Sequence, residues 1–176
     1  MTMREVLIKA LEIAGGEPSE LEGESKKKDK LLKCADMIYQ ELTAEYAKLK
    51  HQEKIWFEKG KAYYAAFSKK VKDITSVCED RSGRKVCFKI RPFCVEADIN
   101  GYATVNYLYH PDEAGMDDEL ELPPQYTPHV LALGVASEYF YRQGLIEEAL
   151  FYRNRYDVAL LNLSRRRQGI TLKKGG

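Results

Sequence analysis

Apolar residues recur every three or four positions at both ends of the chain, whereas apolar and polar residues alternate in the middle. The first spacing is the period of a helix with one buried side, and the second is the period of a strand. The pattern predicts an α+β fold, mainly a helical bundle with an inserted small antiparallel β-meander. The helices are expected over residues 3–14, 29–49, 127–143 and 146–166.

Local residues mark where several of these helices begin and end. Thr2 and Glu5 have the spacing of a capping box, in which each side chain accepts a hydrogen bond from a backbone N–H at the helix start. Thr127 followed by Pro128 is a favoured N-cap and first helical position. The connection at Gly144 is so short that the last two helices are expected to form an antiparallel hairpin.

Turn residues divide the middle of the chain into three to five short strands. Asn100-Gly101 favours a type I′ hairpin turn, because both central residues of that turn need positive φ. Residues 80–83 predict a second turn, and Pro92 falls between strands.

Three parts make up the expected organisation of the chain. Residues 1–53 and 111–164 form one discontinuous helical bundle, residues 54–110 form the inserted antiparallel sheet, and residues 165–176 form an extended C-terminal tail.

The composition of the 176 residues, 44% hydrophobic and 31% charged, is that of a globular protein. The net charge of +1 argues against a dedicated nucleic-acid-binding domain, although it leaves room for a local basic patch. Two runs are candidates, Lys26-Lys27-Lys28-Asp29-Lys30 and Arg165-Arg166-Arg167. For the first run a solvated helix start is favoured, because acidic residues crowd the loop before it. Without an apolar run of about 20 residues or a secretion signal, an intracellular protein is expected.

No residue pattern in the chain indicates a catalytic or metal-binding class. The four cysteines contain no C-x2-C pair, so free thiols are expected rather than a zinc site or a disulfide framework. The acidic stretch over residues 112–121 lacks the spacing of a calcium loop. The three histidines have no nucleophile pattern beside them. We therefore expect no cofactor, no metal and no catalytic residues, and an enzyme without a recognisable motif remains the less favoured alternative.

Four stretches, taken with the order of the elements, carry a resemblance to a known family. They are residues 3–11, residues 105–111 (Val-Asn-Tyr-Leu-Tyr-His-Pro), residues 117–139 with Leu122-Pro123-Pro124 and Ala136-Ser137-Glu138-Tyr139, and residues 144–156 with Glu147-Glu148-Ala149 and Arg155-Tyr156. The chain resembles the head–tail connector adaptors of tailed bacteriophages, also called head-completion or neck proteins. The resemblance covers most of the chain.

The resemblance implies a structural virion protein that is not an enzyme. Adaptors of this family form a ring, usually of twelve subunits, below the portal, where the ring extends the DNA channel and docks the stopper or tail. The implied partners are the portal ring, a stopper or tail-completion protein, other copies of the chain, and genomic DNA that passes without sequence-specific binding. The implied location is the virion neck, with the host cytoplasm as the place of assembly.

The family's C-terminal segment packs against the portal, and here that segment is basic with apolar anchors, as suits a segment that orders on a partner. A frayed terminus is the alternative. The implied portal-binding residues are Arg165, Arg166, Arg167, Ile170, Leu172, Lys173 and Lys174.

Aromatic residues are enriched at interfaces, so the hairpin helices are expected to contribute subunit contacts, with core packing as the alternative for the tyrosines. The candidate residues are Tyr139, Arg142, Tyr152, Arg155 and Tyr156. The competing hypothesis for the whole chain is a nucleic-acid-binding or regulatory helical module that uses the two basic runs.

Overall fold

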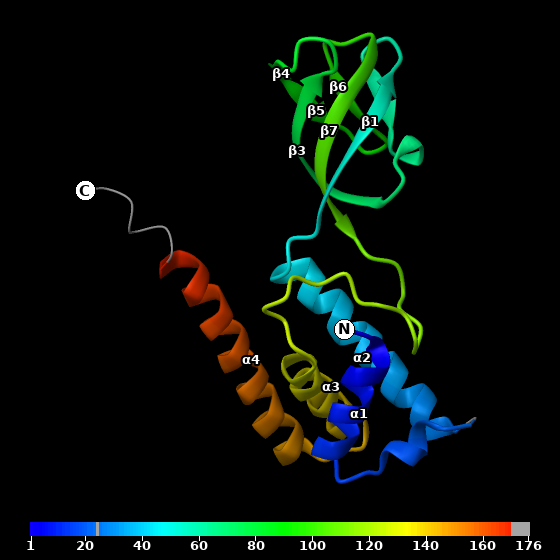
Figure 1. The fold of residues 1–176 in the computed structure, drawn as a ribbon, viewed down its shortest axis with the longest axis vertical. Helices are drawn as coiled ribbons and strands as arrows, with labels where there is room; N and C mark the ends of the chain where they lie inside the picture. The colour runs from blue at the N-terminus through cyan, green and yellow to red at the C-terminus, as the bar shows by residue number, and fades with distance from the viewer. Residues whose placement is uncertain (24, 170–176) are drawn as a thin grey trace. The chain divides into compact units, whose positions relative to one another are not determined.

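The computed structural model describes residues 1–23 and 25–169, and of residues 165–169 the backbone alone. The chain divides into two compact units (Figure 1). The helical unit comprises Met1–Ala47 and Glu113–Gly176, and the β unit comprises Lys48–Asp112. Helices and antiparallel strands together make an α+β fold, as the hydrophobic pattern predicts.

The helical unit packs its helices around one hydrophobic core (Figure 1). Each helix contributes buried apolar residues, among them Leu7 of α1, Ile38 of α2, Leu131 of α3 and Leu160 of α4. No helix in the described ranges is long and apolar enough to span a membrane. The helices are α1 (Met3–Ile13), the short 3-10 helix η1 (Pro18–Leu21), α2 (Lys26–Glu45), α3 (Pro128–Arg142) and α4 (Ile146–Gly169).

The predicted caps of α1 and α3 are confirmed. Glu5 N–H donates to Thr2 Oγ1 at 3.3 Å, and Thr2 N–H donates to Glu5 Oε2 at 3.1 Å, which completes the capping box. Thr127 Oγ1 accepts a bond from Val130 N–H, and Pro128 occupies the first position of α3. Both helices therefore begin where their local residues satisfy free backbone N–H groups.

Two expected helix ends differ from the structure. The segment α2 begins at Lys26 and ends at Glu45, so the chain leaves the helix four residues before the predicted end at residue 49. Near the C-terminus, α4 continues to Gly169, so the extended conformation predicted from residue 165 is wrong for residues 165–169. The reason is that residues 146–168 contain neither Gly nor Pro, and Arg and Gln have high helix propensity. The rest of the predicted tail lies outside the described residues.

The β unit consists of two sheets, with strand orders β1-β7-β3-β4 and β2-β6-β5 in the described chain. All of its pairings are antiparallel. The first and last strands pair along their length, from Lys50 opposite Leu108 to Phe57 opposite Gly101. The strands are β1 (Lys50–Phe57), β2 (Lys61–Tyr63), β3 (Lys70–Glu79), β4 (Lys85–Val86), β5 (Phe88–Ile90), β6 (Cys94–Ala97) and β7 (Gly101–His110), with a 3-10 turn, η2 (Tyr64–Ala66).

The β unit has more strands than the three to five expected, and its tightest hairpin turn is not where the sequence predicts it. Lys59 (φ 49°) and Gly60 (φ 79°) join β1 to β2, and Glu58 and Lys61 exchange two backbone hydrogen bonds across them. Two successive positive φ values define a type I′ turn. Asn100 instead uses its side chain, whose Oδ1 accepts a bond from Lys59 N–H at 3.1 Å, and the predicted type I′ turn at Asn100-Gly101 is wrong.

Candidate protein-contact face on helix α4

The helical hairpin of α3 and α4 places the candidate site. Gly144 has φ 78°, Leu145 N–H donates to Phe140 O at 3.1 Å, and Gly144 N–H donates to Tyr141 O at 3.0 Å. This is a Schellman motif, which ends α3 and reverses the chain. At 1.5 Å per residue α3 is about 22 Å long and α4 about 36 Å, so α4 extends well past its partner helix.

One side of α4 packs into the helical unit. Tyr156 and Leu160 are almost completely buried, and Ser137 Oγ–H donates to Ala149 O at 2.9 Å. Tyr152 stacks on Phe140 of α3 with ring centroids 5.5 Å apart. These contacts fix the rotation of α4 about its own axis.

A glycine allows the close approach of three helices at this point. A Cβ atom on Gly134 of α3 would lie 2.9 Å from Ile38 Cγ2 and 3.3 Å from the Tyr156 ring. The absence of a side chain at Gly134 therefore lets Tyr156 of α4 and Ile38 of α2 pack against the α3 backbone. Among the residues that the structure describes, the Tyr156 hydroxyl has no hydrogen-bond partner, and burial raises the pKa of this side chain.

A second set of apolar side chains on α4 is exposed and faces away from the core. Residues of a helix are about 100° apart around its axis, so the exposed apolar side chains of α4 fall within an arc of about 140°. Phe151 and Val158 lie opposite the buried Tyr156 and Leu160, whereas Ile146 and Leu150 lie on the flank of the helix that borders α3. The exposed fractions of the set range from 47% to 59%. We call these residues the outer face of α4: Ile146, Leu150, Phe151, Val158 and Leu161.

A groove continues the outer face toward α3. It has a volume of about 250 Å³ and lies at the hairpin end of the two helices. Exposed Tyr141 of α3 borders it together with Ile146 and Leu150 of α4. Exposed apolar surface of this kind typically marks a protein contact site.

Two of the residues predicted for the subunit interface lie in the core instead. Tyr156 is fully buried and Tyr139 is 9% exposed, because both project toward the other helices of the unit. Their assignment to a surface contact is therefore wrong. The interpretation as core packing, the alternative left open by the sequence, applies to both.

The other three predicted interface residues lie nearer the surface. Arg142 is bonded to Glu138 at 2.7 Å, and Tyr152 is half-buried in its stack on Phe140. Arg155 is exposed, with its guanidinium 5.6 Å from the centroid of the Phe151 ring, so it borders the outer face. A search for apolar residues of α4 outside its core-facing stripe would have found the outer face, because steps of four, one, seven and three residues all keep a side chain within about 140° around the helix axis.

The predicted portal-binding residues are only partly covered by the structure. The last turns of α4 include Arg165, Arg166 and Arg167, of which the structure describes the backbone alone. Ile170, Leu172, Lys173 and Lys174 lie outside the described residues.

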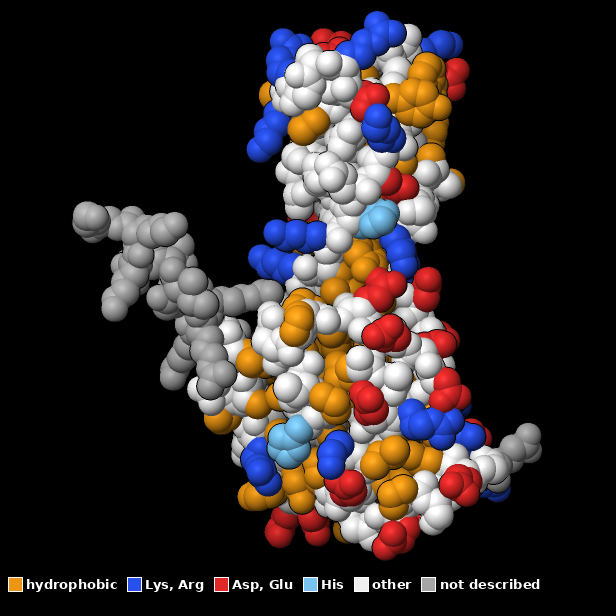
Figure 2. All heavy atoms as spheres, viewed as in Figure 1, with side chains coloured by type: hydrophobic (Ala, Val, Ile, Leu, Met, Phe, Trp, Pro, Cys, Tyr) orange, Lys and Arg blue, Asp and Glu red, His pale blue; other side chains and the backbone are white. Residues whose placement is uncertain are grey.

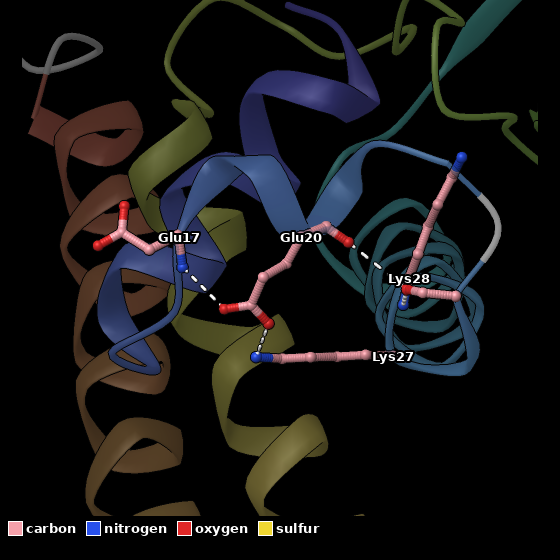
Figure 3. A network of polar contacts seen from close by, with 5 residues as sticks. Glu17, Glu20, Lys27 and Lys28 are labelled. Atoms are coloured by element: carbon pink, nitrogen blue, oxygen red, sulfur yellow. Dashed lines mark hydrogen bonds and ion pairs between the residues drawn. The ribbon is translucent and has the colours of Figure 1, made fainter.

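The basic run at the start of α2 is engaged in local contacts (Figure 3). The Glu20 carboxylate pairs with Lys27 and accepts a bond from Glu17 N–H at 2.9 Å, and these contacts lower the pKa of Glu20. Lys28 Nζ donates to Gly23 O at 3.0 Å. Both ammonium groups thus help to hold the loop before α2, which favours the interpretation of this run as a helix start.

The cysteines are free thiols, as predicted: Cys34 and Cys94 are buried, Cys78 is half-buried and Cys87 is exposed. Burial raises the pKa of the Cys34 thiol to about 11. Among the side chains that the structure describes, no cluster of His, Cys, Asp and Glu is placed to hold a metal ion.

Comparison with models of known protein families finds no match, and comparison with curated proteins finds none.

Proposed function

We propose that this chain is a structural subunit of a bacteriophage head–tail connector: an adaptor that assembles into a ring, binds below the portal, extends the DNA channel and docks the stopper or tail. The observation that carries the proposal is the outer face of α4. A helix with apolar side chains beyond the side that packs into its own core needs a second packing partner, because the helical unit covers only one of the two apolar surfaces. A neighbouring copy of the chain supplies the second.

Ring assembly accounts for the outer face physically. Full burial of an exposed aliphatic or aromatic side chain contributes about 2 kcal/mol, so each of the five half-exposed residues along α4 can contribute about 1 kcal/mol. A heterologous contact of this kind closes into a ring when the rotation between neighbours allows it. The resemblance to the adaptor family motivates the ring and its partners.

The test is the mass of the full chain in solution, measured by light scattering and native mass spectrometry. We expect a concentration-dependent oligomer for the unaltered chain and a monomer for the double variant Leu150→Glu, Val158→Glu. Ile90→Glu, at an equally exposed apolar residue of β5, is the matched control and is expected to assemble normally. The proposal is contradicted if the unaltered chain is monomeric at high concentration. It is also contradicted if the control loses assembly as fully as the double variant does.

The proposed portal contact has a separate test. Residues 165–176 contain five Lys and Arg and no acidic residue. A chain ending at residue 164 is expected to assemble with itself but to lose stoichiometric binding to its portal ring, observed by electron microscopy. Equal portal binding by the full and shortened chains would show that the tail is not the portal contact.

A further inference from the structure

The net charge of +1 conceals an uneven distribution between the two units. The β unit carries 13 Lys and Arg against eight Asp and Glu, whereas the helical unit carries 15 against 19. In Figure 2, Lys and Arg side chains gather around the upper end of the β unit. A local excess of positive charge is the electrostatic signature of nucleic-acid binding, which the whole chain lacks.

Much of this charge lies on a single segment of the β unit. Residues 81–95 contain five Lys and Arg and no acidic residue. All five cations are exposed, and the segment includes β5, which is an outer strand of the β2-β6-β5 sheet. The cations are Arg81, Arg84, Lys85, Lys89 and Arg91.

The strand register shows which side chains share the outer face of this sheet. Glu96 of β6 is opposite Lys61 of β2 on one side and Lys89 of β5 on the other. Directly paired residues project to the same face, so the three side chains form a row across the sheet. That face is the exposed one, because the intervening residues Ala62 and Val95 are buried.

Positive charge predominates in this row. Arg91 Nε lies 2.9 Å from Glu96 Oε2, and Lys61 Nζ lies 3.8 Å from Glu96 Oε1. The bond from Arg91 is the main cause of the lowered pKa of Glu96. Three cations thus surround one carboxylate: Arg91 and Lys61 pair with Glu96, and Lys89, directly opposite it, also helps to lower its pKa.

Two open aromatic rings lie beside the cations. Tyr63 follows Lys61 by two residues in β2, so both project to the same face, and Tyr63 is 57% exposed. Phe93, in the turn between β5 and β6, is 79% exposed and precedes Cys94, the residue opposite Tyr63. A groove of about 630 Å³ adjoins the row of cations, and its charged lining residues are Lys59, Lys61, Lys89, Glu96 and Asp98.

We propose that this face of the β2-β6-β5 sheet binds single-stranded nucleic acid. Bases stack on Tyr63 and Phe93, while the phosphates contact Lys61, Lys89 and Arg91. Sites of this kind combine a positively charged path for the backbone with aromatic rings that accept any base. Alternate residues of a strand are about 7 Å apart, which is comparable to the spacing of phosphates along an extended strand.

The exposed rings are what favour a single strand over other polyanions. Bases in a duplex already stack on one another and offer no free face to Tyr63 or Phe93. An acidic peptide would satisfy the cations and leave both rings without a π-stacking partner. This binding function is additional to ring assembly through α4, since the two surfaces belong to different units.

The experiment measures binding of the full chain to fluorescein-labelled oligo(dT) of about 15 nucleotides by fluorescence anisotropy. We expect saturable binding at about 50 mM salt, and Tyr63→Ala weakens it about tenfold. Lys89→Gln makes the negative slope of log affinity against log salt shallower by roughly 0.7, because one phosphate contact is lost. Two controls keep the affinity of the unaltered chain: Tyr102→Ala, at a tyrosine with the same 57% exposure on the other sheet, and Lys33→Gln in the helical unit. Thermal melting of each variant establishes that it is folded.

Several results would overturn the proposal. Absence of binding at low salt is one, and equal losses from Tyr63→Ala and Tyr102→Ala are another. If a duplex of the same length, or polyglutamate, displaces the labelled strand as effectively as unlabelled oligo(dT) does, the surface binds polyanions in general. Competition by the single strand alone supports the proposal.

Discussion

Arg153 of α4 and Glu41 of α2 form a paired contact in which two guanidinium nitrogens lie 2.6 and 3.2 Å from the two carboxylate oxygens. A second carboxylate, that of Asp157 one turn further along α4, lies 3.2 Å from Arg153 Nε. The two-point geometry restricts rotation of α4 relative to α2. It thereby helps to decide which side of α4 faces the core and which side is left for a partner.

The first prediction concerns this pair. Arg153→Met is expected to lower the free energy of unfolding by about 1 kcal/mol, because a bidentate pair exceeds the contribution of an ordinary surface ion pair. Glu41→Gln is expected to have a similar effect, measured by urea denaturation. In a double-mutant cycle the second substitution should add little to the first. Fully additive losses would mean that the two side chains stabilise the unit independently.

The second prediction concerns Gly134, where three helices meet. Alanine is the better helix former, yet Gly134→Ala is expected to destabilise the chain by about 1–3 kcal/mol, since the new methyl overlaps buried Ile38 and Tyr156. Adding Ile38→Leu, which removes the branched methyl nearest Gly134, should recover part of the loss. A Gly134→Ala chain that melts at a higher temperature than the unaltered one would show that the helices can separate at little cost.

The helix positions were predictable from the sequence because their causes are local. The Thr2–Glu5 box and the Thr127-Pro128 start depend on residues within one turn of each other, and both occur as expected. The orientation of helix α4 was harder to predict, since α4 has apolar residues both toward and away from the core. Their spacing alone does not say which of them pack within the same chain. The assignment of Tyr156 to an interface failed for this reason: the space beside Gly134, a residue of another helix, places its ring in the core.

The arrangement of the β unit depends on contacts that are distant in the chain. Alternation identifies strands such as β7, but it carries no information about the pairing of β1 with β7, whose residues are separated by most of the unit. The proposed nucleic-acid face was missed for the same reason. Lys61, Lys89 and Glu96 become neighbours only through strand pairing, and the net charge of the whole chain obscured the basic excess of the unit.

The third prediction concerns the turn at Lys59 and Gly60. Lys59 adopts positive φ, which disfavours most side chains and is better tolerated by asparagine. Lys59→Asn is therefore expected to raise the stability of the β unit by a few tenths of a kcal/mol. Gly60→Ala is expected to lower it by about 1–2 kcal/mol, because the added Cβ would lie 3.0 Å from Ala97 O at φ 79°. Thermal melting of both variants checks the turn type, and opposite signs from those expected would contradict it.

The last prediction concerns pH and His110, which ends β7. Burial lowers the pKa of His110, and the nearby charges of Lys72 and Lys70 act in the same direction. The folded chain therefore binds a proton at this ring less readily than the unfolded chain does. The stability that depends on neutral His110 is fully present above the ordinary histidine pKa of about 6.5, and it is lost as the pH falls through that value toward the lower folded pKa.

The measurement is the free energy of unfolding of the full chain at about pH 8 and about pH 5, compared with that of His110→Gln. Glutamine remains neutral over this range, so the variant is expected to lose less stability on acidification than the unaltered chain. Carboxylates and the other histidines contribute equally to both proteins and cancel in the difference. If His110→Gln is instead the more acid-sensitive protein, the fold stabilises the protonated ring.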